Sequence, residues 1–513
     1  MKLLIDDKPL TLDALRKAFE EPISLAINKQ LKENIRLASD YIQAATKSDE
    51  AIYGVNTGFG KLAKIRIEFE DLAKLQKNIV SSHAVGVGEL LPNKVVKLIL
   101  LLKVLALSKG LSGVSLSLIE RLCELVNSEI FPCIPAKGSV GASGDLAPLA
   151  HLSQILIGEG YASFSGKTMK AKEALKAANL KPIELGPKEG LALLNGTQVS
   201  TAIALSAYFD AEKLFQAALH SGALTVDAIK GSKKPFDQRI HEARGQPGQK
   251  KVANELIELL QGSEIMASHQ ECDRVQDPYS IRCQPQVMGA CLDAMNHAAS
   301  ILNIEANAVT DNPLVFLDSN EIISGGNFHA EPVAFAADHL ALALAEIGSI
   351  SERRCALLID TNLSGLPAFL VKESGVNSGL MIPQVTAAAL VSENKSLAHP
   401  SSVDSIPTSA NQEDHVSMAT HAAYRLKAMT ENLSYIIAIE FLSAAQGIEF
   451  HEPLSTSKKL QATMIKIRAH SDSFKEDRSL SDDIKRLSES IIKGEMSDEQ
   501  PPTIFKVEND AIH

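Results

Sequence analysis

Three long apolar stretches in the second half of the chain constrain its fold most strongly. They are STAIALSAYFDAEKLFQAALHSGALTVDAI (200–229), QVMGACLDAMNHAASILNIEANAV (286–309) and EPVAFAADHLALALAEIGSISERRCALLID (331–360). Their apolar residues recur at helical spacing, and many residues on the apolar face are small, as expected where long helices pack closely in a bundle. Trp is absent and aromatic residues make up only 4% of the chain, so the core must be aliphatic. The sequence therefore predicts a mainly α fold.

The first two hundred residues have a different character, because helical patches alternate there with glycine-rich turns. We expect an N-terminal domain over 1–200, and a long-helix bundle with a C-terminal helical region over 201–513. Two β-hairpins are expected, at YASFSGKTMKA (161–171) and PLVFLDSNEIISGGNF (313–328). The charged tail at 471–502 is expected to form a solvated pair of helices.

Charge and hydropathy narrow the possible partners and location of the protein. The net charge is −11 and no basic block stands out, which argues against a nucleic-acid partner. The most apolar run, 95–111, is interrupted by Lys97, Lys103 and Lys109, so it predicts a buried or amphipathic helix rather than a membrane span. Two aspartates follow the first five residues, too soon for a signal peptide. We expect a cytoplasmic protein without a membrane partner.

The six cysteines indicate no special chemistry. They lie at 123, 133, 272, 283, 291 and 355, with no CxxC pair and no Cys/His spacing suited to zinc. We expect buried thiols in a reducing compartment, and no metal site.

The stretch GSVGASGDLAPLAH (138–151) combines glycines with very small residues and allows several interpretations. A phosphate-binding loop is excluded, because the glycine spacing is wrong and because Pro132 and Pro135 argue against a buried parallel strand before it. A serine nucleophile on a G-x-S-x-G elbow is a weak alternative, since here Gly144 follows Ser143 directly.

Two further interpretations fit the same stretch better. The first is a structural turn in which Asp145 caps a helix whose first turn holds Pro148. The second is backbone chemistry, in which the Gly144 nitrogen attacks the Ala142 carbonyl and Ser143 loses its hydroxyl. This would give 4-methylidene-imidazole-5-one (MIO), a strong electrophile. The residue types suit this reaction, because Gly144 has no Cβ to shield its nitrogen and Ser143 provides the leaving hydroxyl.

A resemblance favours the backbone chemistry. The stretch 138–151 resembles the signature of the aromatic amino acid ammonia-lyases, which build MIO from Ala-Ser-Gly. Six other segments resemble motifs of this family in the same order: YGVNTGFG (53–60), SSHAVGVGE (81–89), EGLALLNGTQVS (189–200), QDPYSIRCQPQVMGA (276–290), TDNPLVF (310–316) and SIPTSANQEDHVSM (405–418). The resemblance implies an aspartase/fumarase-like fold with an N-terminal MIO-bearing domain and a long-helix bundle. It also implies a homotetramer with active sites shared between subunits, and no external cofactor.

Two positions indicate the substrate within this family. Ser82-His83 and Glu413 are similar to the residues of family members that act on histidine, whereas phenylalanine lyases typically carry Gln in place of Glu413. An imidazole ring offers two nitrogens to His83 and Glu413, which a phenyl ring would leave unpaired. We therefore expect L-histidine as substrate, with trans-urocanate and ammonia as products. Capture of the substrate amine by MIO is favoured over capture of its imidazole. An aminomutase, a serine hydrolase and an inactive binding protein are the alternatives.

The resemblance also assigns roles to individual residues. Catalytic roles fall to Tyr53 as the base for the β-proton, to Ala142, Ser143 and Gly144 as the source of MIO, and to Tyr279 and Glu413. Substrate-binding roles fall to His83, Asn195, Gln276, Arg282 and Phe328. Arg282 suits the substrate carboxylate, because a guanidinium binds a carboxylate through two parallel hydrogen bonds. No catalytic role is assigned to His329, His399 or His415.

Overall fold

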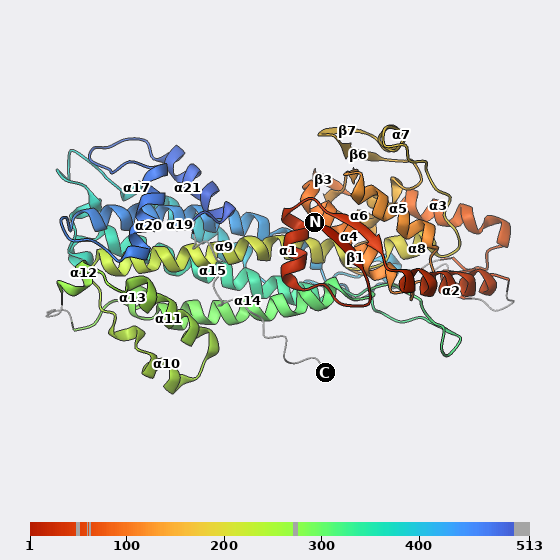
Figure 1. Cartoon of the computed structure of the whole chain (residues 1–513), viewed down its shortest axis with the longest axis horizontal. Coiled ribbons are helices and arrows are strands. Elements are labelled where there is room, and N and C mark those ends of the chain that lie inside the picture. The colour runs from red at the N-terminus through yellow and green to blue at the C-terminus, as the bar shows by residue number, and fades with distance from the viewer. Residues whose placement is uncertain (48–51, 59, 61–62, 270–274, 497–513) are drawn as a thin grey trace. The chain divides into compact units, whose positions relative to one another are not determined.

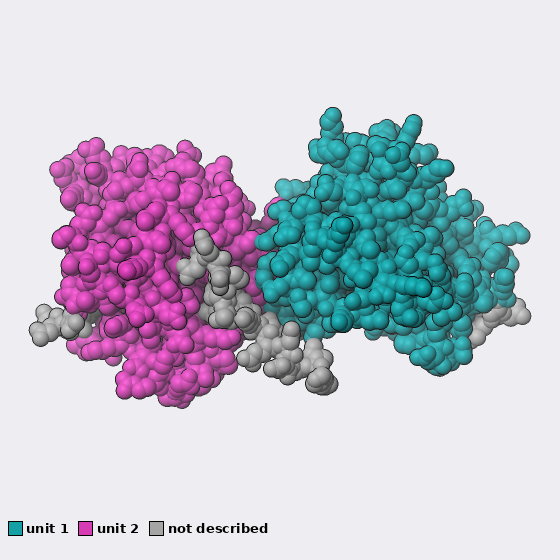
Figure 2. Space-filling view, viewed as in Figure 1, with its two compact units in different colours: residues 1–206, 299–338, 400–424 teal, residues 207–298, 339–399, 425–513 magenta. Residues whose placement is uncertain are grey.

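The computed structural model describes residues 1–47, 52–58, 60, 63–269 and 275–496, and its contacts divide the chain into two units. Unit 1 comprises 1–206, 299–338 and 400–424, and unit 2 comprises 207–298, 339–399 and 425–513 (Figure 2). The first segment of unit 1 ends close to the boundary expected at residue 200. Two later segments nevertheless return to unit 1, so the chain does not divide simply into an N-terminal and a C-terminal half.

The mainly α fold is confirmed, and most strands are short (Figure 1). The helices of the first segment of unit 1 are α1 (Leu12–Glu20), α2 (Lys29–Ala45), α3 (Leu72–His83), α4 (Asn93–Ser108), α5 (Leu116–Asn127), α6 (Leu146–Gln154), α7 (Ala171–Ala177) and α8 (Glu189–Leu194). The later segments add α18 (Ala419–Tyr424). Unit 2 contains α10 (Gln238–Arg244), α11 (Pro247–Leu260), α12 (Glu264–Ala267), α13 (Tyr279–Arg282), α16 (Thr361–Ser364), α17 (Met381–Leu397), α19 (Leu426–Glu449), α20 (Lys458–His470) and α21 (Ser481–Lys493).

The three apolar stretches form the long helices that the sequence predicts. They are α9 (Gln198–Ala228), α14 (Gln284–Ala306) and α15 (Glu331–Ile359), and each contributes residues to both units. By length and composition alone α15 could cross a membrane, but 67% of its most apolar window is buried inside the protein, as in a core helix. In unit 2, the end of α15 packs with α17 and α19 through Cys355, Val391 and Ile436.

The strands form four small sheets. β1 (Lys2–Ile5) pairs in parallel with β2 (Ser24–Ile27), and β3 (Val87–Leu90) pairs antiparallel with β5 (Pro135–Lys137). β4 (Phe131–Pro132), β6 (Tyr161–Phe164) and β7 (Lys167–Lys170) form an antiparallel sheet, and β8 (Leu314–Phe316) pairs antiparallel with β9 (Glu321–Ile323). The pairs β6–β7 and β8–β9 confirm both predicted hairpins.

Helix α4 forms the core of unit 1, as its apolar sequence predicts. Every residue from Val95 to Ser108 is buried, including Lys97 and Lys103. The Lys97 ammonium donates a hydrogen bond to the Glu21 carbonyl, which satisfies a charge that burial would otherwise leave without a partner.

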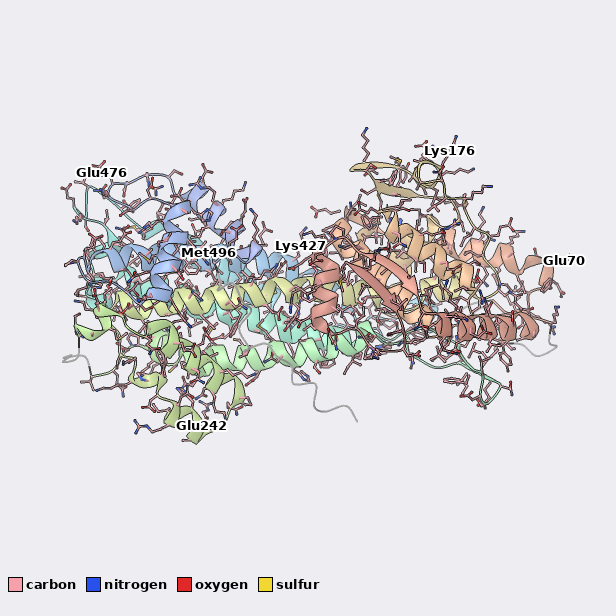
Figure 3. All side chains as sticks on the ribbon, in the orientation of Figure 1. Glu70, Lys176, Glu242, Lys427, Glu476 and Met496 are labelled. Atoms are coloured by element: carbon pink, nitrogen blue, oxygen red, sulfur yellow. The ribbon has the colours of Figure 1, made fainter. Side chains whose placement is uncertain are left out.

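Several charged side chains lie on the surface, and the described cysteines are free thiols. The charged side chains of Glu70, Lys176, Glu242, Lys427 and Glu476 are exposed, whereas the Met496 side chain is buried (Figure 3). The five described cysteines are free; those at 123, 291 and 355 are buried, whereas those at 133 and 283 are only half-buried. Burial raises the pKa of the Cys123 and Cys291 thiols to about 12, so both stay protonated at neutral pH. The sixth, at 272, lies outside the described residues.

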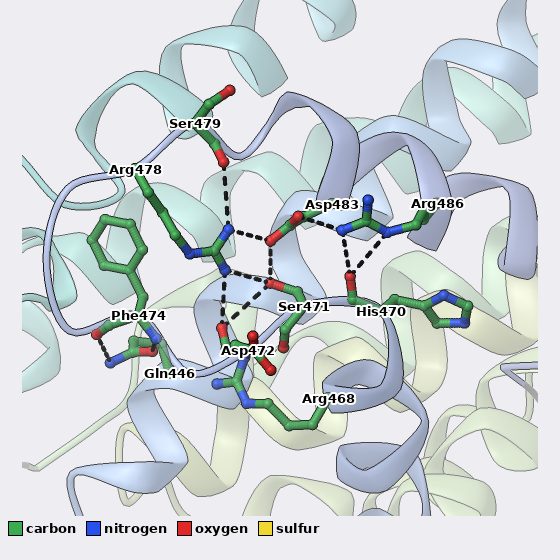
Figure 4. Close-up of polar contacts among 10 residues, drawn as sticks. All are labelled: Gln446, Arg468, His470, Ser471, Asp472, Phe474, Arg478, Ser479, Asp483 and Arg486. Atoms are coloured by element: carbon green, nitrogen blue, oxygen red, sulfur yellow. Dashed lines mark hydrogen bonds and ion pairs between the residues drawn. The ribbon is translucent and has the colours of Figure 1, made fainter.

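The charged tail forms one helix within the described residues, not the expected solvated pair. The Asp483 side chain near the start of α21 is buried, and accepts hydrogen bonds from Arg478 (2.6 Å), Arg486 (2.6 Å) and Ser471 (2.7 Å) (Figure 4). Burial alone would raise the pKa of Asp483, but hydrogen bonds from Ser471 and Arg478 hold it below its ordinary value. Arg478 and Arg486 of this tail thus form ion pairs with Asp483.

Asp483→Asn is expected to lower the free energy of unfolding by about 1–3 kcal/mol, because two arginines lose their charged partner. Asp482→Asn is the matched control, since Asp482 is the exposed neighbour in the same helical turn. A depressed carboxyl pKa stabilises the fold above the pKa of the unfolded chain, and this contribution disappears as the pH falls through the folded-state pKa. Denaturant unfolding should therefore show a difference between wild type and Asp483→Asn at pH 7 that shrinks in acid. Equal effects of both variants would contradict the assignment.

Candidate active site

Unit 1 contains a cavity of about 1310 Å³ that collects most of the predicted site residues. Seven of them line it: Tyr53, His83, Ala142, Ser143, Asn195, Phe328 and Glu413. They come from loops and helix ends far apart in the sequence, so the fold of unit 1 brings them together.

The Ala142-Ser143-Gly144 segment is a tight turn between glycines. Gly141 and Gly144 adopt φ angles of 68° and 73°, in the left-handed region that favours glycine. A Cβ at Gly144 would lie 2.1 Å from the Gly196 carbonyl oxygen, so no other residue fits there without moving the backbone. The conformation and the close approach both require glycine at this position.

Two distant segments hold this turn in place. The Gly196 carbonyl accepts a hydrogen bond from the Asp145 amide at 2.8 Å, and the Gly196 amide donates to the Ser143 carbonyl at 3.4 Å. On the other side, the Ser417 hydroxyl donates to the Gly141 carbonyl at 3.0 Å. The backbone around Ser143 is therefore fixed from both directions.

Asp145 does not cap helix α6 with its side chain, which corrects the expectation from sequence. It precedes the helix, but its fully buried carboxylate instead accepts hydrogen bonds from Thr420 (2.6 Å), Ser139 (3.2 Å) and the amide and hydroxyl of Ser200 (2.8 and 3.0 Å). Burial raises the pKa of Asp145, while these donors act in the opposite direction. Asp145 thus ties the turn to α9 and α18 rather than to α6.

Glu413 lies beside Ser143 and is itself oriented by hydroxyl groups. Its Oε1 accepts a hydrogen bond from the Ser143 hydroxyl at 3.3 Å. Its Oε2 accepts from Thr408 at 2.8 Å and from Ser409 at 2.7 Å. One carboxylate oxygen is therefore held by the protein, while the other faces the Ala-Ser-Gly segment.

His83 ends helix α3 at the wall of the cavity. Its Nδ1 lies 3.0 Å from the Ser82 hydroxyl. Burial lowers the pKa of His83, although the charge of Glu413 acts to raise it, so the imidazole is mainly neutral at pH 7. A neutral imidazole has one donor and one acceptor nitrogen, which suits a ligand that carries both.

The cavity wall also includes three other predicted site residues, Tyr53, Asn195 and Phe328. The Tyr53 hydroxyl is within 3.3 Å of the Gly60 amide, which donates to it. The Asn195 amide donates to the Asn312 carbonyl at 2.9 Å. Phe328 is half-buried on the cavity wall. Phe59, inside the motif that contains Tyr53, lies outside the described residues.

Gln276, Tyr279 and Arg282 belong to unit 2 and are not among the residues that line this cavity. The Arg282 Nε donates to the Asp277 carbonyl at 3.0 Å, and the guanidinium carbon lies 4.6 Å from the centre of the Tyr279 ring. Tyr279 is 70% exposed. Gln276 is also exposed, whereas Arg282 is half-buried.

Two histidines with no role predicted from sequence, His329 and His415, also line the cavity. The His329 Nε2 lies 3.2 Å from the His415 carbonyl, and the ring centres are 5.7 Å apart. With Glu331, these residues bring three potential ligand atoms within 4.8 Å of one another. In the sequence, both histidines lie within or beside the family motifs. That position alone does not distinguish a histidine that lines a cavity from one with a structural role.

Comparisons with known proteins show the family of this chain. The family described as aromatic amino acid lyase matches residues 10–469. A histidine ammonia-lyase of Paracidovorax citrulli is 57% identical over 94% of this chain and 95% of its own length. The crystal structure of histidine ammonia-lyase from Trypanosoma cruzi superposes with a TM-score of 0.89 at 39% identity, covering 97% of this chain and 94% of that one. Tyrosine aminomutase from Streptomyces globisporus has a TM-score of 0.92 at 32% identity, covering 98% and 100%. With a family match over most of its length, the chain belongs to the aromatic amino acid lyase family.

Proposed function

We propose that this enzyme eliminates ammonia from L-histidine to give trans-urocanate. The observation that carries the proposal is the contact of Glu413 with Ser143 in a cavity that His83 also lines. A carboxylate beside the reacting segment and a mainly neutral imidazole on the wall of the same cavity suit a substrate ring with two nitrogens. The names and identities of the histidine ammonia-lyases that the chain resembles support the same substrate.

We further propose that Ala142, Ser143 and Gly144 form the MIO group. These residues fit it, because Gly144 occupies a position where a Cβ has no room and Ser143 is open to the cavity. Once formed, MIO supplies an electrophilic carbon that makes departure of the amine possible.

The other residues would bind the substrate and move its proton. His83 and Glu413 would hold the imidazole ring, and Tyr53 would remove the β-proton. Phe328 would pack against the substrate. Asn195 would help to hold the substrate carboxylate or the oxygen of the MIO ring, since it lines the same cavity as Ala142 and Ser143.

A homotetramer would explain the position of the remaining residues. We propose that Gln276, Tyr279 and Arg282 reach the cavity of another copy of the chain, where Arg282 would bind the substrate carboxylate through two parallel hydrogen bonds. Gln276 and Tyr279 are exposed and Arg282 is half-buried, which supports contact with another copy of the chain. We also propose that the protein is located in the cytoplasm.

The purified protein is expected to convert L-histidine to trans-urocanate and ammonia without any added cofactor. Absorbance of urocanate and chromatography of the products measure this, with L-phenylalanine and L-tyrosine as competing substrates. Cinnamate or coumarate, without urocanate from histidine, would contradict the proposed substrate. A β-amino acid as the main product would indicate an aminomutase.

A serine hydrolase has less support. Such an enzyme needs a histidine base hydrogen-bonded to the nucleophilic serine. The Ser143 hydroxyl instead donates to the Glu413 carboxylate.

A further inference from the structure

A buried lysine lies within the apolar stretch 98–107 of helix α4. Lys103 of α4 is 1% exposed. Its ammonium donates to the Asn195 carbonyl at 2.6 Å and to the Ala192 carbonyl at 3.2 Å. These two carbonyls lie at the C-terminal end of α8, where backbone oxygens lack partners inside the helix and a positive charge is favourable. Lys103 therefore holds the end of α8 in place.

A second buried cation reinforces the same point in the fold. The Lys188 ammonium pairs with Asp311 at 2.6 Å, with side chains 0% and 4% exposed. The other oxygen of Asp311 accepts from the Asn195 amide at 3.4 Å. Asn195 is thus held through its backbone by Lys103 and through its side chain by Asp311.

Keeping Lys103 charged in this core is costly. Burial lowers the pKa of Lys103 to about 7, although Asp311 and Asp145 act to raise it. An apolar side chain would fill the same space without this cost. A buried lysine at this place therefore indicates a need for its hydrogen bonds rather than for packing alone.

The backbone held by Lys103 continues directly into the reacting segment. Gly196 follows Asn195, pairs with Gly144 in a parallel β-bridge, and contacts both Ser143 and Asp145 through hydrogen bonds. The Asn195 carbonyl that binds Lys103 and the Gly196 amide that donates to the Ser143 carbonyl therefore belong to the same peptide group.

We propose that Lys103 is a positioning residue for formation of the MIO group, acting through Asn195 and Gly196. The inference rests on the proposed function. In the first step the Gly144 nitrogen bonds to the Ala142 carbonyl carbon, and the carbonyl oxygen leaves as water with the amide protons of Gly144 and Ser143. In the second step the Ser143 hydroxyl leaves as water with the proton of its own Cα. Neither step needs an oxidant or a reductant.

Ring closure depends on how close the fold holds the Gly144 nitrogen to the Ala142 carbonyl carbon. Displacements of about 1 Å can slow a positioned reaction by roughly a hundredfold. Without the Lys103 ammonium, two buried carbonyls at the end of α8 lose their donor, and the segment 195–196 is free to shift. The support for Gly144 would then loosen while most of the fold is kept.

Lys103→Met tests this, and Lys97→Met is the matched control. Lys97 lies on the same helix, is buried, and also donates to a backbone carbonyl, but that of Glu21 and not one beside the reacting segment. The readout is the mass of the tryptic peptide Gly138–Lys167 from folded protein, which neither substitution alters. In Lys103→Met the fraction of peptide lacking two waters should fall roughly tenfold or more. In Lys97→Met it should equal that of wild type. Folded Lys103→Met protein with the full two-water deficit would overturn the proposal.

If Lys103→Met does not fold, the rate of maturation decides instead. Lys103→Arg keeps the charge and the donors but displaces them, so freshly synthesised chains should lose the two waters several-fold more slowly than chains with Lys97→Arg. Equal rates would overturn the proposal. A wild-type peptide of full sequence mass would refute MIO formation itself, whereas a deficit that is equal in wild type and folded Lys103→Met would refute only the role of Lys103.

Discussion

Ser143→Ala is expected to reduce ammonia release from L-histidine by at least about a thousandfold. The variant has no hydroxyl to lose, so its Gly138–Lys167 peptide should not be two waters short. The fold should survive, because in the unreacted chain the hydroxyl donates a hydrogen bond to Glu413 worth only about 1 kcal/mol, and the account predicts that wild type loses this hydroxyl as well. Intact and peptide mass, urocanate absorbance and a thermal melt measure the three quantities.

The control for this change is Ser165→Ala, at an exposed position in the β6–β7 turn that does not line the cavity. It should keep both the two-water deficit and the activity. A Ser143→Ala variant that still releases ammonia at the wild-type rate would exclude any chemistry that depends on this serine.

Glu413→Gln is expected to lower kcat/KM for L-histidine by about a hundredfold while leaving the two-water deficit intact. Glutamine keeps the shape of the side chain but removes the charge and one acceptor from the oxygen pair that Thr408 and Ser409 orient. Activity toward L-phenylalanine, whose ring has no nitrogen to pair, should fall much less or rise. Steady-state kinetics on both substrates measure the change in specificity.

Asp404→Asn provides the control, since Asp404 is an exposed carboxylate in the same returning segment of unit 1 and lies outside the cavity. It should leave both values of kcat/KM unchanged. If Glu413→Gln lost activity equally on histidine and phenylalanine, Glu413 would serve the reaction in general and not the recognition of imidazole.

The sequence predicts elements governed by local pattern. The period of apolar residues identifies α9, α14 and α15, and turn residues between short apolar runs identify both hairpins. The resemblance of seven motifs identifies seven of the residues that line the cavity, but not His329 and His415. These signals lie along the chain and need no knowledge of tertiary contacts.

Features that depend on distant contacts were missed or misjudged. Asp145 sits where an N-cap is expected, yet hydroxyls from Ser200 and Thr420, brought close only by the fold, take its carboxylate. In the sequence, Lys103 is one of three lysines that interrupt an apolar run. Its hydrogen-bond acceptor at the end of α8 becomes visible in the folded structure. The return of 299–338 and 400–424 to unit 1 is likewise a tertiary property that no local pattern encodes.

We propose that Ala142, Ser143 and Gly144 react with one another to form the catalytic electrophile. The mass of the Gly138–Lys167 peptide from wild-type protein is the decisive measurement for this reaction. A mass two waters below that of the sequence is the predicted result, with the loss assigned to residues 142–144 by fragmentation. A peptide of full sequence mass, from protein that still releases ammonia from histidine, would contradict the account.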